Sequence, residues 1–282
     1  MSDLPSATRA PRARITAPEL RQMKLAGEPI VMLTAYDFPF ARLVDAAGVD
    51  VVLVGDTLGA VVQGHETTLP VTLEQMLYHT RIVTSACRRA LVVGDLPFGS
   101  YQQGPRQAVE SAVRLVKEGG AQAVKLEGGA AVALSIEAIV AAELPVFAHL
   151  GLTPQAYHRM GGHRVQGRDA AGRERLLADA RSIESAGACA VVLEGIPLDL
   201  AREITDALGI PTIGIGAGPY CDGQVLVLHD LLGLTERPPR FAKAYASLAS
   251  EVARAAVAYG AEVKAGAFPT EAHAYPKPEA RS

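Results

Sequence analysis

The chain has 282 residues, with 27 Lys and Arg against 30 Asp and Glu, a near balance that argues against binding to nucleic-acid phosphates. Hydrophobic residues make up 49% and charged residues 20%, which supplies a large core and excludes a disordered chain. The three cysteines form no paired motif and no apolar run approaches a membrane span, so we expect a cytoplasmic protein that does not bind membranes.

Residues 1–14 hold three arginines and two prolines without an apolar segment, and we expect them to form a flexible tail. After this tail, short apolar runs alternate with amphipathic stretches, a pattern typical of βα units around a parallel sheet. Eight strands are predicted, at Ile30 to Ala35, Asp50 to Val54, Ala90 to Gly94, Ala123 to Leu126, Pro145 to Ala148, Ala190 to Leu193, Thr212 to Ile215 and Gln224 to Leu228. The predicted helices include Leu73 to Cys87, Gln107 to Lys117, Arg173 to Ser185 and, after the last strand, Phe241 to Lys264.

Two segments of the chain are near copies, which bears on how the sheet closes. EGGAQAVKLEG at Glu118 to Gly128 and SAGACAVVLEG at Ser185 to Gly195 match at seven of eleven positions. Such an internal repeat favours a closed barrel over a doubly wound sheet. A dinucleotide-binding doubly wound sheet would also have a G-x-G-x-x-G motif after its first strand, and the sequence has none there. We predict a single (β/α)8 TIM barrel with extra N-terminal and C-terminal helices over residues 15–268, and a flexible tail over residues 269–282.

The residues at the ends of the predicted strands are mostly acidic. In a (β/α)8 barrel, the carboxyl ends of the strands form the active site. The residues found there are Asp37, Asp56, Asp95, Glu127, His149 and Glu194. Five carboxylates on one rim would repel one another unless a cation compensated their charge, and such oxygen ligands are typical of Mg²⁺. The alternative is that individual acids cap the helices that follow.

Four side chains of these strands suggest roles in catalysis. Lys125 and Glu127 leave the same face of one strand, so an ammonium beside a carboxylate could hold a substrate carboxylate, act as a Schiff-base nucleophile, or form only an ion pair. Glu194 follows an apolar strand and could abstract a proton, or it could cap a helix. His149 could orient a neighbour or bind a ligand, or it could be purely structural.

The segment from His158 to Arg173 has four glycines and four arginines and little periodicity. It could be a mobile lid with affinity for anionic ligands, or a solvated loop. Both interpretations stay open at this point.

Six long motifs occur in the order typical of one enzyme family. They are VGDTLGAVVQGHETTLPVTLEQMLYHT (Val54 to Thr80), DLPFGSY (Asp95 to Tyr101), AVKLEGG (Ala123 to Gly129), HLGLTPQ (His149 to Gln155), VVLEGIP (Val191 to Pro197) and GIGAGPYCDGQVLVLHD (Gly214 to Asp230). From about Ile15 to about Gly266 the chain resembles the ketopantoate hydroxymethyltransferases. The resemblance implies transfer of a hydroxymethyl group from 5,10-methylenetetrahydrofolate to C3 of 3-methyl-2-oxobutanoate, giving 2-dehydropantoate and tetrahydrofolate in pantothenate and coenzyme A biosynthesis.

The same resemblance implies a role for particular residues. It assigns Asp56, Asp95 and Glu127 to a Mg²⁺ ion that stabilises an enolate of the oxoacid. It assigns Asp56, Thr57, Asp95 and Lys125 to oxoacid binding, with Thr57 in place of the serine of many members, and Glu194 to proton abstraction. It also implies a homodecamer.

Two other functions are weighed against this one. A Schiff-base aldolase would use Lys125 on a 2-oxoacid without a metal ion. A catalytically inert barrel that acts in assembly or sensing is the third hypothesis. The chain keeps all five of the charged residues to which the resemblance assigns chemistry: Asp56, Asp95, Lys125, Glu127 and Glu194. An inert barrel would have no reason to keep them, so their presence argues against the third hypothesis.

Overall fold

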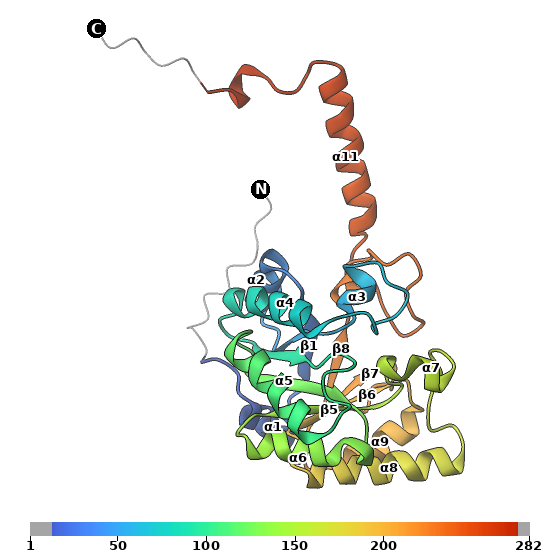
Figure 1. Ribbon diagram of the computed structural model, residues 1–282. Helices are drawn as coiled ribbons and strands as arrows, with labels where there is room; N and C mark the ends of the chain where they lie inside the picture. Colours follow the sequence, from blue (N-terminus) through green and yellow to red (C-terminus); the bar gives the residue numbers. More distant parts are fainter. Residues whose placement is uncertain (1–12, 276–282) are drawn as a thin grey trace. The chain divides into compact units, whose positions relative to one another are not determined.

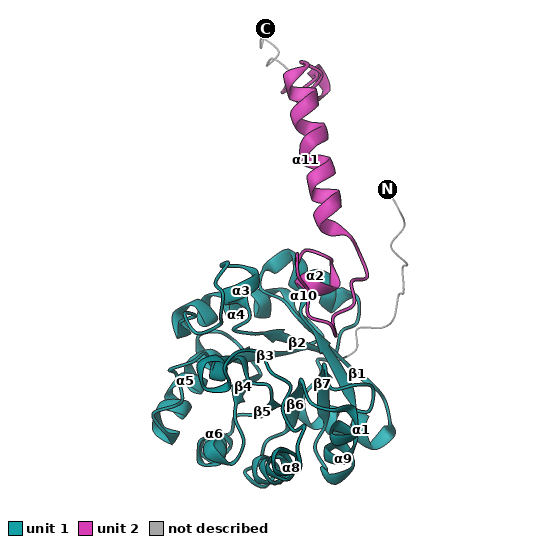
Figure 2. Ribbon diagram, turned by 90° about the vertical axis from the view of Figure 1, so that its right-hand side faces the viewer, with its two compact units in different colours: residues 1–228 teal, residues 229–282 magenta. Residues whose placement is uncertain are grey.

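The structure of the protein, a computed structural model, describes residues 13–275. Two compact units make up the chain, residues 1–228 and residues 229–282, and Figure 2 shows them in different colours. The predicted tail over residues 1–14 lies outside the described residues except for its last two. The predicted tail over residues 269–282 is described as far as Tyr275 and contains a short 3-10 helix, η3 (Glu271–His273).

The first unit is built on a closed barrel of eight parallel strands. Each strand pairs with the next one along the chain, and β8 closes the circle by pairing with β1. The strands are β1 (Ile30–Thr34), β2 (Val51–Val54), β3 (Leu91–Asp95), β4 (Ala123–Glu127), β5 (Val146–Gly151), β6 (Ala190–Glu194), β7 (Thr212–Ile215) and β8 (Gly223–Leu226). The predicted (β/α)8 barrel and its eight strands are confirmed.

Helices surround the strands, as Figure 1 shows. Those of the first unit are α1 (Ala17–Ala26), α2 (Phe38–Ala46), α3 (Leu58–Val61), α4 (Leu73–Ala86), α5 (Pro105–Lys117), α6 (Ala133–Ala141), α7 (Tyr157–Met160), α8 (Ala170–Ser185) and α9 (Leu198–Ala207), with short 3-10 helices η1 (Ala130–Val132) and η2 (Pro154–Ala156). α10 (Leu228–Leu231) begins at the unit boundary, and α11 (Leu248–Lys264) belongs to the second unit. The predicted extra helices at both ends of the barrel are therefore present, as α1 and α11.

Several helices begin where a polar side chain satisfies the first free amides. Asp37 is the N-cap of α2, and its carboxylate accepts a hydrogen bond from the Phe40 amide at 2.9 Å. Asp169 caps α8 through the Gly172 amide at 2.6 Å. Since backbone amides at a helix start have no partner within the helix, these caps fix where each helix leaves the barrel.

The barrel is filled by apolar side chains from alternate strand positions. Together with Leu20 of α1 they form one buried cluster, made of Ile30, Met32, Val51, Leu53, Leu91, Val93, Ala123, Phe147, Ala190, Val192, Ile213, Ile215 and Val225. Inward-facing residues recur with a period of two along each strand. The residue two positions beyond the last apolar one therefore also faces inward, at the carboxyl end of the barrel.

The predicted helix Phe241 to Lys264 is wrong at its start, because α11 begins only at Leu248. The preceding amides bond elsewhere in the second unit: Tyr245 N donates to Leu231 O at 2.8 Å, and Leu248 N donates to Leu232 O at 2.9 Å. These long-range hydrogen bonds hold the chain before α11 in an irregular path, although its composition suits a helix.

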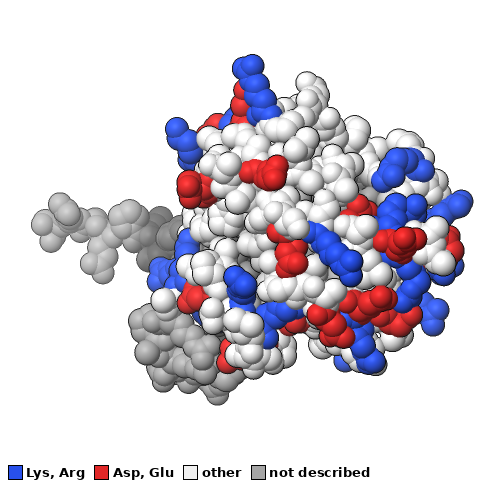
Figure 3. All heavy atoms as spheres, turned by 90° about the horizontal axis from the view of Figure 1, so that it is seen from below, with Lys and Arg blue, Asp and Glu red and all other residues white. Residues whose placement is uncertain are grey.

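Figure 3 views the molecule from below the orientation of Figure 1, and on this face acidic and basic side chains lie beside one another. Ion pairs such as Arg173 with Asp199, at 2.7 Å, join neighbouring helices α8 and α9. Within the described part of the chain, no helix is both long and apolar enough to cross a membrane. Cys87, Cys189 and Cys221 are free thiols.

Candidate active site

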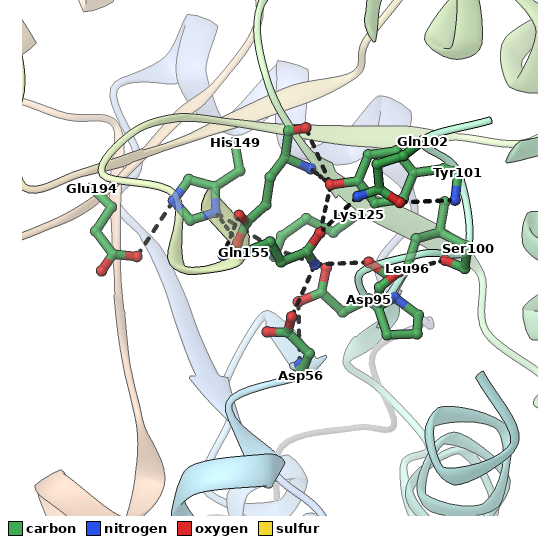
Figure 4. Close-up of polar contacts among 12 residues, drawn as sticks. Asp56, Asp95, Leu96, Ser100, Tyr101, Gln102, Lys125, His149, Gln155 and Glu194 are labelled. Atoms are coloured by element: carbon green, nitrogen blue, oxygen red, sulfur yellow. Dashed lines mark hydrogen bonds and ion pairs between the residues drawn. The ribbon is translucent and has the colours of Figure 1, made fainter. Parts of the chain in front are cut away.

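The carboxyl end of the barrel carries a polar layer that continues the apolar core. On β4, Ala123 belongs to the core, so Lys125 and Glu127 follow it on the same inward face. The same reasoning places a polar side chain at the inward carboxyl end of three other strands. We call these five side chains, together with the buried Asp56 that follows β2, the polar layer: Asp56, Asp95, Lys125, Glu127, His149 and Glu194. Figure 4 labels Asp56, Asp95, Lys125, His149 and Glu194 of this layer, whose side chains gather in one place.

An ion pair joins two neighbouring strands within this layer. Lys125 Nζ lies 2.9 Å from Asp95 Oδ1, and the two residues are register partners of the parallel pair β3 and β4. Asp56 follows β2, and its backbone amide donates to Asp95 Oδ2 at 3.2 Å. Only 4% of Lys125 and 1% of Asp95 is exposed, so the pair is shielded from solvent. The structure thus brings Asp56, Asp95 and Lys125 together.

Gln155 holds several of these groups in place, and the sequence patterns did not single it out. Its side-chain amide donates to Asp56 Oδ2 and to Leu96 O, both at 2.9 Å. Its Oε1 accepts from the Tyr101 hydroxyl at 2.6 Å, and its backbone amide donates to Glu127 Oε2 at 3.0 Å. One buried residue from η2 therefore connects carboxylates that follow β2 and end β4 (Figure 4).

Tyr101 braces the same network from the loop after β3. Its hydroxyl donates to Glu127 O and accepts from the Glu127 amide, both at 3.2 Å. Burial raises the pKa of this phenol well above its usual range, and the nearby Glu127 charge adds to the effect. Tyr101 is therefore a neutral hydrogen-bonding group at physiological pH.

His149 bridges two carboxylates on neighbouring strands. Its Nδ1 lies 3.4 Å from Glu127 Oε1, and its Nε2 lies 3.3 Å from Glu194 Oε2. Lys125 Nζ is also 3.4 Å from Nδ1. Of the roles that the sequence left open for His149, the geometry favours an orienting one, because the ring contacts Glu194, the residue that the resemblance assigns to proton abstraction.

Burial and neighbouring charges shift the pKa values of three carboxylates of the layer. Burial raises the pKa of Asp56 well above its ordinary value, and the neighbouring charges of Asp95 and Glu127 raise it further. Burial also raises the pKa of Asp95, although Lys125 opposes the change. The pKa of Glu127 is lowered despite its burial, because hydrogen bonding to His149 favours the charged form. Asp56 is therefore the carboxylate that most readily holds a proton when no other cation is near.

The two basic residues are held in their charged forms. Burial alone would lower the pKa of Lys125, but the charges of Asp95 and Glu127 outweigh it and raise that pKa. Burial and Lys125 also act to lower the pKa of His149, yet hydrogen bonds to Glu127 and Glu194 raise it to about 9. The layer thus contains an ammonium and an imidazolium among four carboxylates.

The residues assigned to Mg²⁺ fit a divalent cation by chemistry and charge. Among the described residues, no three His, Cys, Asp or Glu side chains gather as a preformed metal centre. Mg²⁺ does not require such a cage, since it keeps several waters and is held by one or two carboxylates together with substrate oxygens. Asp56, Asp95 and Glu127 have buried carboxylate oxygens of the kind that Mg²⁺ binds, and the raised pKa of Asp56 marks a position where an added cation would relieve repulsion.

Two other sequence-selected residues lie apart from this network. Asp37, one of the five strand-end acids, caps α2 as described above, so the capping alternative holds for that residue. Thr57 directly follows Asp56 at the start of α3 and is partly exposed.

The segment from His158 to Arg173 is not one loop, because α7 contains its first residues and α8 its last.

Comparison with known proteins identifies the family. A model of the ketopantoate hydroxymethyltransferase family matches residues 14–271. The chain belongs to this family. The 3-methyl-2-oxobutanoate hydroxymethyltransferase of Geotalea daltonii (strain DSM 22248 / JCM 15807 / FRC-32) is 58% identical over 258 residues, covering 91% of this chain and 97% of the relative. That of Magnetococcus marinus (strain ATCC BAA-1437 / JCM 17883 / MC-1) is 54% identical and is covered over its full length.

Solved structures agree with the barrel. A phosphoenolpyruvate phosphomutase from Streptomyces platensis subsp. rosaceus superimposes with a TM-score of 0.60 at 18% identity, covering 93% of this chain and 92% of that one. A 2,3-dimethylmalate lyase of the PEP mutase/isocitrate lyase superfamily gives 0.58 at 18% identity over 93% and 92%. These likenesses concern the fold alone. Family membership makes this chain an enzyme, a hydroxymethyltransferase, as the sequence motifs predict.

Proposed function

We propose that the enzyme transfers a hydroxymethyl group from 5,10-methylenetetrahydrofolate to C3 of 3-methyl-2-oxobutanoate, a step of pantothenate and coenzyme A biosynthesis. With one water consumed, the products are 2-dehydropantoate and tetrahydrofolate. The observation that carries the proposal is the buried layer in which a lysine, a histidine and four carboxylates meet at the carboxyl ends of β2 to β6. Such a layer can bind an anionic oxoacid and move a proton within one site.

The oxoacid binds beside Asp56, Thr57, Asp95 and Lys125 in this proposal. Lys125 supplies a permanent positive charge, because the neighbouring carboxylates keep its amine protonated. The Thr57 hydroxyl supplies a donor next to Asp56 at the start of α3. Because the lysine is buried and water is excluded, its attraction for a substrate carboxylate is stronger than it would be at the surface.

Asp56, Asp95 and Glu127 would hold Mg²⁺ in the loaded enzyme. When bound, the cation draws electron density from the 2-oxo group of the substrate and so makes the C3 hydrogen more acidic. Gln155 keeps the Asp56 and Glu127 carboxylates oriented toward the site through its side-chain and backbone amides. Positioning of this kind limits the reorganisation needed when substrate arrives.

Glu194 removes the C3 proton in this proposal. Its side chain is 16% exposed, more than the 4% of His149, so it remains accessible from the substrate side. His149 lies 3.3 Å from Glu194 Oε2 and fixes the direction of the carboxylate. Water adds to the one-carbon unit of the folate, and both of its C–N bonds break as the two nitrogens take up the protons of that water. The carbanion at C3 attacks the released formaldehyde carbon, and the proton held by Glu194 converts its oxygen to the hydroxyl group.

A direct assay tests this proposal. The purified enzyme is incubated with 3-methyl-2-oxobutanoate, 5,10-methylenetetrahydrofolate and Mg²⁺, and both products are measured. We expect equal amounts of 2-dehydropantoate and tetrahydrofolate, and loss of turnover on chelation of the metal. Absence of both products with folded protein would reject the proposed reaction.

The aldolase alternative receives a separate test. A Schiff base requires a neutral amine, whereas the ion pair with Asp95 keeps Lys125 protonated. Borohydride added in the presence of oxoacid should therefore leave Lys125 unmodified in intact-mass and peptide analysis. A reduced adduct on Lys125 would favour the aldolase.

We also infer a cytoplasmic homodecamer. Free Cys87, Cys189 and Cys221 suit a reducing compartment. In α11, the large apolar side chains of Val252, Val257 and Val263 are not buried by their own unit, so they need cover from the barrel or from another copy. Sedimentation velocity should give a single species of ten chains, and a monomer at micromolar concentration would reject the assembly.

A further inference from the structure

Two neighbouring cavities lie beside the polar layer, and the catalytic scheme above leaves both unused. One has a volume of about 390 Å³ and reaches Glu127 and Gln155. The other has a volume of about 400 Å³ and reaches His149. Gly128, Thr153 and Arg159 line both cavities, so the two meet where the chain leaves β4 and β5.

The first cavity suits a flat ring with a polar edge. Its walls include Leu69, Phe98 and Val132, and nearly half of Phe98 is exposed at 48%. An exposed aromatic face beside aliphatic walls can stack on a planar ligand. At the inner end lies Glu127, whose carboxylate oxygens can accept hydrogen bonds from the edge of such a ring in addition to those from His149 and Gln155.

The second cavity suits an anionic tail. It is lined by Arg159 and Arg175, which are both exposed and form no ion pair or hydrogen bond with any described residue. By contrast, Arg173 on the same helix as Arg175 is paired with Asp199. The one acid in the lining, Asp179, is already engaged, since its Oδ1 accepts from the Ala130 amide at 2.8 Å. Two free guanidinium groups remain to bind carboxylates.

We propose that the two cavities together bind the one-carbon donor. The reduced pterin ring occupies the first cavity and stacks on Phe98, while the glutamate carboxylates of the tail pair with Arg159 and Arg175 in the second. The one-carbon unit of such a donor joins the ring to the tail, so it falls where the cavities meet, next to the carboxyl end of β4. This inference rests on the proposed function, because it assumes a folate as donor.

The segment around Arg159 has a sequence that is compatible with a mobile lid or with a solvated loop. Arg159 lies in α7 and lines both cavities, so its guanidinium can pair with the tail of a ligand whose ring occupies the first cavity. In this proposal, the anionic ligand that the arginines of this segment suggested is the glutamate tail of the one-carbon donor. Phe98 belongs to the motif DLPFGSY, where nothing in the spacing indicated a ligand.

Direct binding tests the assignment without turnover. Calorimetry measures the affinity of tetrahydrofolate, and of a tetrahydropterin that lacks the aminobenzoylglutamate tail, for the full-length enzyme and its variants. We expect Arg159→Ala and Arg175→Ala each to weaken tetrahydrofolate binding by about tenfold and to leave tetrahydropterin binding unchanged. Phe98→Ala should weaken both ligands.

Arg181→Ala is the matched control, because Arg181 is exposed on α8, like Arg175, but lines neither cavity. It should bind both ligands as the unmodified enzyme does, while Arg159→Lys should recover part of the tetrahydrofolate affinity. If the enzyme binds tetrahydrofolate and both arginine-to-alanine variants stay within twofold of it, the assignment of the cavities is wrong. If the unmodified enzyme binds no tetrahydrofolate at all, the proposed donor is wrong, and the assignment with it.

Discussion

Gln155 offers a sharp test of how the site is held together, because one buried side chain makes three hydrogen bonds of 2.9 Å or less. Gln155→Met keeps the length of the side chain and removes its amide. Asp56 Oδ2 and Leu96 O then each lose a donor that was 2.9 Å away. The Tyr101 hydroxyl keeps its contacts with the Glu127 backbone.

The expected cost follows from these two orphaned acceptors. A buried acceptor left without a partner costs about 1–3 kcal/mol, so the two together predict a loss of about 2–6 kcal/mol in the free energy of unfolding. The hydrogen bond from Gln155 also helps to lower the pKa of Asp56, so its removal should raise that pKa further. Divalent-ion affinity at neutral pH should therefore fall as well.

Urea unfolding of the metal-free protein measures the first effect, and calorimetric titration with Mg²⁺ measures the second. Gln102→Met is the matched control, since Gln102 is exposed and contacts Gln155 only at 3.4 Å. This control should lose less than about 1 kcal/mol. If Gln155→Met is as stable as Gln102→Met and binds Mg²⁺ equally well, the proposed positioning role of Gln155 is refuted.

Three further predictions concern the same layer. Asp95→Asn should raise the Kd for Mg²⁺ at least about tenfold in calorimetry, and an unchanged Kd would remove Asp95 from the ligand set. Gly151→Ala should cost about 1–3 kcal/mol more than Gly48→Ala in urea unfolding. Both glycines have φ near +90°, at 96° and 88°, but a Cβ at Gly151 would clash with Glu194 O, whereas a Cβ at Gly48 would meet no atom within 4 Å. Equal losses would contradict the close approach. Because the pKa of His149 is raised from 6.5 to about 9, its charged form stabilises the metal-free fold fully below about pH 6.5, and this stability is lost as pH rises through 9. The stability margin over His149→Gln should shrink across that range, and a constant margin would show that the folded state does not raise this pKa.

The sequence was sufficient to predict the strands because they are apolar on both faces. It placed their carboxyl ends one to three residues short at β3, β4, β5 and β6, where the polar residues Asp95, Glu127 and Glu194 still belong to the strands. Polarity argued for a loop, while backbone pairing with the neighbouring strand extends the ladder to Asp95 with Lys125 and to Gly151 with Glu194. Tertiary pairing therefore outweighs local composition at these positions.

Some residues of the site could likewise be predicted from the sequence, and others could not. Lys125 and Glu127 share a strand, so their common face could be predicted from a period of two. Gln155 could not be found like this, since its partners Asp56 and Tyr101 lie 99 and 54 residues away along the chain. Nor could spacing show that Asp37 caps α2 while the other acids of the rim gather inside the barrel.

The proposed reaction depends most directly on removal of the C3 proton of the oxoacid by Glu194. Exchange of that hydrogen in deuterated water, followed by proton NMR of 3-methyl-2-oxobutanoate with Mg²⁺ and without folate, isolates this step. The unmodified enzyme should catalyse exchange, and Glu194→Gln should slow it by about 10²–10⁴-fold while binding the oxoacid with similar affinity. Exchange at the normal rate in Glu194→Gln would contradict the account.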